Sequence, residues 1–375
     1  MKQIKVLQVI DNINVDSGVA TSVMNIYRHI DLGVIQFDFF VCHDGTNRGS
    51  TYADEIGEKG GKVFYFGSPL SLRTLRASVK KAKSFFKENI QEYDVIHLHT
   101  PTIAEFTLKY AKRYGAKSTV THSHSTMTSL NPVKRIINAY LISKIKKYTD
   151  HFWACSTEAA EFLFGEDACK EGRVQVIHNA VEHQRFSFDP KKRLEARESL
   201  GVGDRTVFVH VSNFSPIKNL RFIVPVIESV LKIRRDVLFL FVGDGVTRKA
   251  VESALIGKGL GDACLFAGRT TDVGRFLQAA DAFFLPSLKE GFPVAAVEAQ
   301  ANGLKCFLSD TITREVNVGQ ITYLPLDKNK WVEEFLGVSV SQDSDRLKAS
   351  CQFMNSELTV EKIAKNVQRL YESVV

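Results

Sequence analysis

Short apolar runs alternate with amphipathic stretches along the whole chain, which is the pattern of parallel strands connected by helices. In the first half we expect strands at Val6–Ile10, Gln36–Cys42, Val63–Phe66, Val95–His99, Ser118–His122, His151–Cys155 and Val174–Ile177. The helical spacing falls between these runs, at Val19–Ile30, Leu72–Asn89, Ile103–Tyr114 and Pro132–Tyr148. Such an alternation predicts a parallel sheet covered by helices on both faces.

The second half repeats this pattern, with strands expected at Val207–Val211, Leu238–Val242, Ala263–Phe266, Ala282–Leu285 and Lys305–Ser309. A polar, charged stretch at Glu182–Arg197 separates the halves. We therefore expect an N-terminal domain over residues 1–188 and a C-terminal domain over residues 189–358. A last helix within residues 359–375 could pack on either domain, including back on the first. The predicted class is α/β, with two Rossmann-like, doubly wound domains facing a central cleft.

Composition limits the class of protein without choosing a partner. The 375 residues carry 49 basic and 42 acidic side chains, a formal net charge of +7. This excess favours anionic partners such as phosphate-bearing ligands or anionic lipid. The six cysteines are scattered singly, as in reduced cytosolic proteins. The first apolar run is too short for a signal peptide, and we expect a cytoplasmic protein without a spanning helix.

The stretch Lys289–Gly303, KEGFPVAAVEAQANG, places two glutamates around a turn and the start of a helix. Pro293 suits the first turn of a helix, where its missing N–H costs nothing. The amides that follow carry the positive end of the helix dipole and favour phosphate or sugar oxygens. Glu290 could accept hydrogen bonds from hydroxyls, and Glu298 could bind a diol such as a ribose. Spacing alone favours a simpler interpretation, in which Glu298 and Asn302 form a solvated helix face.

Two other segments that follow predicted strands could bind a phosphate-bearing ligand. Lys218, in HVSNFSPIKNL, opens a helix and so opposes the helix dipole, an effect that a bound phosphate would offset. A solvated surface lysine explains this segment equally well. The Gly-Asp-Gly turn at Gly243–Gly245 could admit a ribose or merely reverse the chain. Neither the GxGxxG of a nicotinamide site nor a P-loop motif occurs.

Histidine pairs end two of the predicted strands: His97 and His99 in DVIHLHTP, and His122 and His124 in THSHS. Residues two apart in a strand share one face, so each pair could contribute to a metal site. Neither pair has a third ligand nearby in the sequence. Hydrogen bonding is therefore the favoured role, and we expect no metal.

The segment 131–150, NPVKRIINAYLISKIKKYTD, has five basic residues and one acidic residue. Ile137, Leu141, Ile145 and Tyr148 give it an apolar stripe. Each basic residue near anionic lipid contributes about 1 kcal/mol, so the segment could hold the protein at the inner face of a membrane. A helix packed on its own domain explains the poor segregation of the charges better.

Together these segments resemble the family-four glycosyltransferases, which are retaining enzymes with the two-domain GT-B fold. The most specific part is Gly268–Asp310, whose frame G…D…PS…EGFP…EA…G…SD contains the family's two glutamates with seven residues between them. Ala154–Gly165 and Val176–Phe186 look like the family's domain-linking segments. The resemblance covers nearly the whole chain and is nearest to bacterial capsule and exopolysaccharide enzymes. It reverses the preference for a solvated helix face.

The resemblance implies a hexosyltransferase that binds a nucleotide-sugar, taken as a UDP-sugar, mainly in the C-terminal domain. Glu290 would bind the sugar hydroxyls, Lys218 would neutralise the diphosphate, and Glu298 would hold the ribose. His122 matches the family's strand-end histidine near sugar and acceptor, with His124 as the second choice. The other implied donor contacts are Gly18, Asn213, Gly243, Gly245, Arg269, Thr270, Gly291, Phe292, Pro293 and Val294.

Two departures from the family's pattern affect the expected donor site. The family usually has Gly-Arg where this chain has Ser212-Asn213, so a charged contact with the donor phosphates is lost. Such a contact is worth roughly 1.5–3 kcal/mol, or about ten- to a hundredfold in affinity, unless Arg269 or Arg248 replaces it. Ser17-Gly18 also stands where the family often has Gly-Gly.

The acceptor implied by the resemblance is a growing lipid-linked polysaccharide or another glycan, with no cofactor, metal or nucleic acid involved. Acceptor recognition would lie in the loops Asp44–Tyr52 and Ser123–Pro132. Two alternatives stay open. One is an enzyme like the UDP-sugar 2-epimerases, which needs no acceptor. The other is a degenerate, non-catalytic partner subunit with the same fold, suggested by Asn213.

Overall fold

The computed structural model describes residues 2–15, 17–43, 50–67, 74–126 and 131–375. The chain forms two compact units: unit 1 is Met1–Ala180 with Val360–Val375, and unit 2 is Val181–Thr359. The division predicted at residues 188 and 189 lies further along the chain, in the polar stretch that follows Val181. Unit 2 is therefore inserted between two segments of unit 1.

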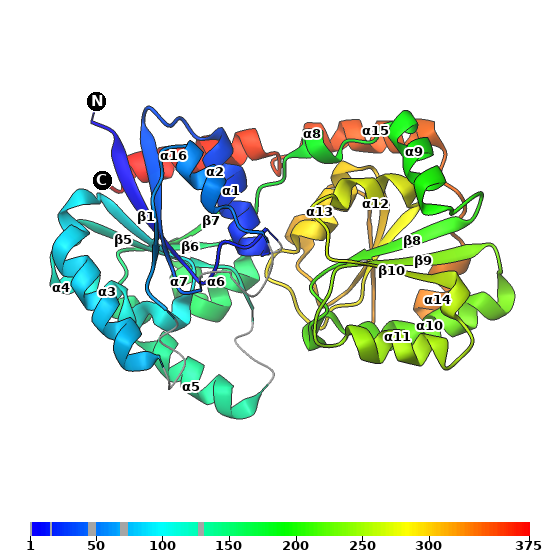
Figure 1. Ribbon diagram of the computed structural model, residues 1–375, viewed down its shortest axis with the longest axis horizontal. Helices are drawn as coiled ribbons and strands as arrows, with labels where there is room; N and C mark the ends of the chain where they lie inside the picture. Colours follow the sequence, from blue (N-terminus) through cyan, green and yellow to red (C-terminus); the bar gives the residue numbers. More distant parts are fainter. Residues whose placement is uncertain (1, 16, 44–49, 68–73, 127–130) are drawn as a thin grey trace. The chain divides into compact units, whose positions relative to one another are not determined.

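Unit 1 is built on a seven-stranded parallel sheet with the order β3-β2-β1-β4-β5-β6-β7 (Figure 1). Its strands are β1 (Ile4–Ile10), β2 (Ile35–Val41), β3 (Val63–Tyr65), β4 (Val95–Leu98), β5 (Ser118–Ser123), β6 (His151–Ala154) and β7 (Val174–Val176). Its α-helices are α1 (Gly18–His29), α2 (Ala53–Glu58), α3 (Leu75–Asn89), α4 (Leu108–Arg113), α5 (Pro132–Ser143), α6 (Thr157–Phe164), α7 (Glu166–Lys170) and α16 (Val360–Ser373). Short 3-10 helices are η1 (Ile90–Glu92), η2 (Pro101–Phe106) and η3 (Ile145–Lys147). Separate apolar clusters pack on the two faces of the sheet, as its almost wholly buried strands require.

Helix α16 packs beside α1, although the two helices are far apart in the sequence (Figure 1). Its apolar positions recur at helical spacing and lie in the same buried cluster as the apolar face of α1. Burying a side chain such as Ile363 or Val367 contributes about 1.5–3 kcal/mol, so this face explains why the helix docks here. Of the two packings considered from the sequence, the structure shows the return to the first unit.

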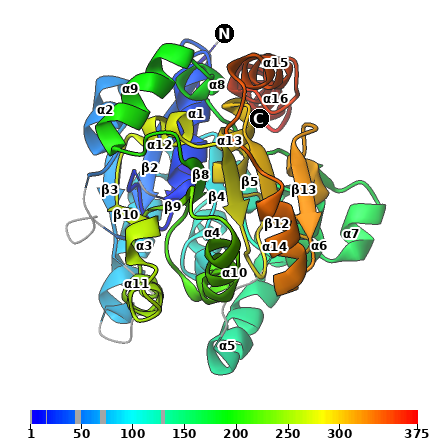
Figure 2. The same cartoon turned by 90° about the vertical axis from the view of Figure 1, so that its right-hand side faces the viewer.

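Unit 2 is a six-stranded parallel sheet with the order β10-β9-β8-β11-β12-β13. Its strands are β8 (Thr206–Val211), β9 (Val237–Val242), β10 (Cys264–Gly268), β11 (Ala282–Leu285), β12 (Lys305–Ser309) and β13 (Ile321–Leu324). Its α-helices are α8 (His183–Phe186), α9 (Pro190–Leu200), α10 (Leu220–Ile233), α11 (Arg248–Ile256), α12 (Val273–Ala279), α13 (Val294–Ala301), α14 (Lys328–Leu336) and α15 (Asp343–Met354). Its 3-10 helices are η4 (Pro216–Lys218), η5 (Gly261–Ala263) and η6 (Arg314–Val316). Helices α10 and α14 lie side by side, as Figures 1 and 2 both show.

These two sheets confirm the predicted α/β class with two doubly wound domains. Several details differ from the prediction. The edge strand β13 was not predicted. The expected helix Ile103–Tyr114 is broken into η2 and α4, and the expected helix Pro132–Tyr148 ends at Ser143. The expected start of another helix at Leu72 lies outside the described residues. Within the described part of the chain, no helix is both long and apolar enough to cross a membrane.

The strand order of each sheet reverses direction at one point, which is where open parallel sheets bind ligands. In unit 1 this switch point lies between β1 and β4, and in unit 2 between β8 and β11. The loops that follow these four strands are therefore the places to look for a site.

Candidate functional site

Lys218 and Glu290 meet at the switch point of unit 2. Lys218 ends η4, which follows β8, and Glu290 lies in the loop after β11. The Lys218 Nζ is 2.6 Å from the Glu290 Oε1, and the side chains are only 16% and 11% exposed. The two loops are also joined through their backbones, because the Leu288 amide donates to the Ile217 carbonyl at 2.8 Å. The structure thus brings together two residues that the sequence separates widely.

Lys218 does not open the helix as predicted. Helix α10 begins at Leu220, and between them Asn219 has a φ of 53°, in the left-handed region. Asparagine tolerates this conformation better than most residues. The turn redirects the chain between η4 and α10, so Lys218 projects from the loop and is not part of the first α-helical turn.

Hydroxyl groups hold the Glu290 loop in place. The Ser287 Oγ donates to the Glu290 Oε1 at 2.6 Å. The Ser287 carbonyl accepts hydrogen bonds from the hydroxyls of Ser309 and Thr311, the latter at 3.0 Å. Ser287 and Ser309 belong to the motif frame, but their role could not be read from the sequence. They connect the carboxylate to the end of β12.

The start of α13 offers backbone donors next to Glu290. Gly291, Phe292 and Pro293 are buried, and Pro293 is the N-cap residue, one position before the first turn. No side chain caps this helix. Among the described residues, no acceptor reaches the amides of Val294 and Ala295. These two N–H groups and the helix dipole make the loop suited to a phosphate or other anion.

Glu298 lies in the second turn of α13 and is half-buried. Burial raises the pKa of its carboxyl group to about 7, and the positive charge of Arg185 opposes this shift. Among the described residues, no hydrogen-bond donor contacts the carboxylate. The Arg185 guanidinium donates to the Thr271 carbonyl, which links α8 to the loop after β10. No pattern in the sequence indicates this role of Arg185, because the contact joins segments that are distant in the chain.

The Gly243–Gly245 turn is needed for packing within unit 2. A Cβ added at Gly243, where φ is 121°, would lie 1.9 Å from the Ser212 carbonyl oxygen. A Cβ at Gly245 would lie 2.7 Å from the Phe214 carbonyl oxygen. Both glycines therefore allow the turn to approach the segment that contains Asn213. These contacts explain why the chain reverses here, and a donor contact at Gly243 and Gly245 stays a prediction.

Asn213 is exposed on the loop after β8, and its Oδ1 accepts a hydrogen bond from the Ser215 hydroxyl at 3.2 Å. Arg248, a proposed substitute for the missing arginine, lies 3.9 Å from Asp244 and 3.6 Å from Glu252. Two carboxylates thus already compete for its charge.

Arg269 and Thr270 follow β10, the outer strand of the sheet. Arg269 is exposed, and the Thr270 hydroxyl accepts a hydrogen bond from the Asp272 amide at 3.0 Å. This bond precedes α12, whose N-cap is Asp272. The two residues border the Arg185 contact with Thr271.

In unit 1, Ser17 caps α1, because its hydroxyl accepts a hydrogen bond from the Ala20 amide at 3.4 Å. Gly18 is the first residue of α1, and a Cβ added there would meet nothing within 4 Å. Asp16, the residue before Ser17, lies outside the described residues. Residues 44–49 and 127–130 of the predicted acceptor loops also lie outside them.

Four histidines of unit 1, His97, His99, His122 and His124, form one cluster at the carboxyl ends of β4 and β5. His122 is inside β5 and only 5% exposed, whereas His124 follows the strand and is half-buried. The His99 Nδ1 lies 2.9 Å from the His124 Nε2. Of the two histidines considered for the acceptor side, His124 is the one that reaches the surface of its unit.

Helix α5 has a different apolar face from the one predicted. Ile145 is buried, and Leu141 and Tyr148 are half-buried, so most of the predicted stripe faces inward. The exposed apolar side chains instead are Val133, Ile136, Ile137 and Tyr140. The prediction was wrong because it treated residues 132–148 as one straight helix, whereas α5 ends at Ser143.

Comparisons with known proteins agree with this fold and motif. The family model "Glycosyltransferase Family 4" matches residues 17–185, and "Glycosyl transferases group 1" matches residues 192–318. The EpsF protein of Bacillus subtilis, named as a glycosyltransferase, is 31% identical over 340 residues, which is 88% of this chain and 86% of EpsF. The UDP-Gal:alpha-D-GlcNAc-diphosphoundecaprenol alpha-1,3-galactosyltransferase of Escherichia coli is 25% identical over 59% of this chain and 58% of its own. The capsular polysaccharide biosynthesis glycosyltransferase CapH of Staphylococcus aureus is 24% identical over 70% of each chain.

Among solved structures, Anabaena HepE in complex with UDP and glucose superposes with a TM-score of 0.77. It is 18% identical and the match covers 99% of this chain and 100% of HepE, so the likeness extends to both units. The chain therefore belongs to the family-four glycosyltransferases with the GT-B fold, and it is similar to bacterial capsule and exopolysaccharide enzymes.

Proposed function

We propose that the protein transfers a sugar from a UDP-sugar to a hydroxyl group of a lipid-linked glycan, with retention of the anomeric configuration. The contact between Lys218 and Glu290, beside the uncapped start of α13, is the observation that carries the proposal. HepE binds UDP and glucose on the same fold, and the name of the E. coli relative gives UDP-Gal as its donor. Both support a uridine nucleotide here.

Lys218 and the amides of Val294 and Ala295 supply positive charge where the donor diphosphate would lie. In the transfer, the bond between the anomeric carbon and the diphosphate oxygen breaks, and negative charge develops on the leaving UDP. Groups already held in place stabilise this charge more effectively than water, which must reorient. The acceptor oxygen forms the new bond on the face that the UDP leaves, and its proton is released.

The two glutamates have separate binding roles in this proposal. Glu290 accepts hydrogen bonds from the sugar hydroxyls while Lys218 turns to the diphosphate. Glu298 accepts hydrogen bonds from the ribose diol. Protein groups alone supply the positive charge, so UDP binding should persist in the presence of a chelator.

The exposed face of α5 suggests how a lipid-linked acceptor is reached. Val133, Ile136, Ile137 and Tyr140 are 53–73% exposed, and α5 has no buried residue. Figures 1 and 2 show α5 projecting from the rest of unit 1. The exposed basic residues of the segment are Lys134, Arg135, Lys144, Lys146 and Lys147. Apolar side chains surrounded by positive charge match an anionic lipid surface.

Vesicle sedimentation tests this membrane contact separately from catalysis. We expect the protein to bind vesicles that contain phosphatidylglycerol more tightly than vesicles of phosphatidylcholine. The double variant Ile136→Ser/Tyr140→Ser should lose this binding and keep UDP affinity. Val246→Ser, at an exposed apolar residue of unit 2, is the matched control. Equal binding by the double variant and the control would refute the α5 contact and leave the donor assignment untouched.

UDP binding and release test the transfer itself. Calorimetry should show UDP binding, and a screen of UDP-sugars with membrane extract should release UDP only when the extract is present. Conversion of a UDP-sugar without any acceptor would instead support the epimerase-like alternative. Absence of UDP binding would overturn the proposal in favour of a degenerate partner subunit, for which Asn213 is the motivating residue.

A further inference from the structure

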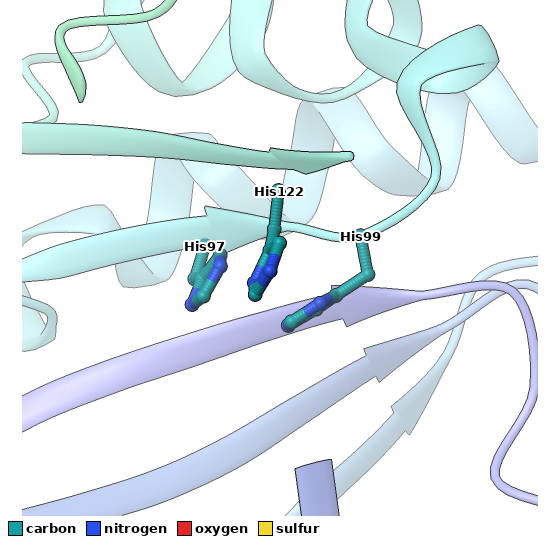
Figure 3. A group of neighbouring side chains, drawn as sticks. All are labelled: His97, His99 and His122. Carbon is teal, nitrogen blue, oxygen red and sulfur yellow. The ribbon is translucent and has the colours of Figure 1, made fainter. Parts of the chain in front are cut away.

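Ring nitrogens of three histidines from two neighbouring strands converge in unit 1. His97 and His122 lie on β4 and β5, and His99 follows β4 directly. One ring nitrogen from each residue lies within 4.8 Å of the other two. Figure 3 shows His97 and His122 with their rings nearly parallel, at an interplanar angle of 5°, and His99 beside them. Each histidine pair lacks a third ligand in its own strand. The neighbouring strand of the sheet supplies it.

Two of these nitrogens are buried without a partner. The His97 Nε2 and the His122 Nε2 have no hydrogen bond among the described residues. Both rings line a cavity of about 20 Å³, which has room for one ion or one water molecule. Buried polar atoms in native proteins are nearly always satisfied, so two in one cavity indicate a polar occupant.

The chemistry of the lining selects the kind of occupant. The three imidazole rings line the cavity together with apolar and uncharged polar side chains. Neutral imidazole is the form of histidine that coordinates metals. Imidazole nitrogen suits Zn²⁺ and other late divalent transition metals, whereas Mg²⁺ and Ca²⁺ prefer oxygen ligands.

Hydrogen bonds behind the rings resemble those that orient metal ligands. The His97 Nδ1 lies 2.5 Å from the Tyr371 hydroxyl of α16. Gln8 connects the system, because its amide donates to Tyr371 at 3.1 Å and its Oε1 lies 2.7 Å from the His99 Nε2. The other ring nitrogen of His99, Nδ1, is hydrogen-bonded to His124. To bind the ion, His99 would therefore have to give up one of its two hydrogen bonds.

We propose that His97, His99 and His122 form a buried binding site for one Zn²⁺-class divalent transition-metal ion. Zn–N bonds of about 2.0–2.1 Å in a tetrahedral site bring ligand nitrogens to about 3.4 Å from one another. The three rings must therefore rotate inward, and the cavity gives them the space to do so. All three of these residues belong to unit 1.

Metal titration of the tag-free, chelator-treated full chain tests the proposal. Calorimetry with Zn²⁺ should show about one saturable ion per chain, and Co²⁺ should give the strong visible absorption of a tetrahedral site. His97→Gln and His122→Gln should each weaken Zn²⁺ binding by more than about a hundredfold. Loss of a metal ligand weakens binding more than loss of a residue that is hydrogen-bonded to a ligand. His151→Gln, on β6 outside the cluster, is the control.

Tyr371→Phe gives a second test that preserves the ring packing against Phe37 and Trp153. Loss of a hydrogen bond behind a ligand typically weakens metal binding about 10–100-fold. Zn²⁺ should also raise the Tm of the wild type and of His151→Gln, but not that of His97→Gln. No saturable binding, or equal affinity in His97→Gln and His151→Gln, would overturn the proposal.

Discussion

The Lys218 ammonium and the Glu290 carboxylate neutralise each other across the two loops that flank the switch point of unit 2, at 2.6 Å. Both charges are largely removed from water, so removing one leaves the other poorly compensated. The pair thus links donor binding to local stability. Substitutions that keep the size of the side chain are the ones that separate these two effects.

Lys218→Gln should lower turnover about 10²–10³-fold, the range found when one preorganised group that stabilises developing charge is removed. UDP release at saturating donor measures this effect, and circular dichroism checks the fold. Lys289→Gln, at an exposed lysine next to Glu290, should leave turnover unchanged. If Lys218→Gln transferred sugar as well as Lys289→Gln did, the assignment of the diphosphate site would fail.

Donor affinity should depend on pH through Glu298, whose pKa is raised to about 7. A ribose diol donates hydrogen bonds to the ionised carboxylate, so UDP should bind about tenfold more weakly at pH 6 than at pH 8. The free energy of unfolding should change with pH in the opposite direction. Folding favours the protonated form of Glu298, so ionisation of this carboxyl group lowers the free energy of unfolding as the pH rises from 4.5 to about 7. Calorimetry at both pH values checks the first effect. Glu298→Gln should remove the dependence, and a pH profile unchanged by this variant would contradict the role.

Asn213→Arg should strengthen UDP binding about ten- to a hundredfold, because it restores a charge-assisted contact with the phosphates. Asn213→Gln controls for side-chain length without charge. Calorimetry of both variants with UDP is the measurement. If the arginine gives no gain and Arg269→Gln weakens binding instead, then Arg269 already supplies the charge.

Gly243→Ala should destabilise the protein more than Gly259→Ala does. Both glycines have positive φ, but only at Gly243 would a Cβ meet a backbone oxygen, that of Ser212. The left-handed conformation costs about 1–2 kcal/mol at Gly259, where φ is 73°, and the cost is at least as large at Gly243, where φ is 121°. Overpacking adds about 1–3 kcal/mol at Gly243. Urea denaturation measures the difference. Equal losses in the two variants would show that the turn can move away from Ser212.

The parallel sheets were predictable because they depend on local order, whereas Lys218 and Glu290 were assigned to a donor site only through the family resemblance. Apolar runs mark the strands, and residues directly after strands flanking the switch point must meet at one edge of the sheet. Contacts between segments that are distant in the chain could not be predicted, because no local sequence pattern indicates them. Arg185 beside Glu298 and Tyr371 beside His97 depend on where α8 and α16 dock. Ile145 and Tyr148 were misplaced for a related reason, since both lie beyond the end of α5 at Ser143.

The insertion of unit 2 between two parts of unit 1 has a consequence for biosynthesis. All residues of unit 2 leave the ribosome before Val360–Ser373, so unit 2 can complete its core while unit 1 still lacks α16. Until that helix arrives, the part of the apolar cluster around α1 that α16 covers is exposed, and Gln8 lacks the Tyr371 hydroxyl as a partner. The nascent first unit therefore exposes apolar surface during synthesis, and chaperones bind surface of this kind.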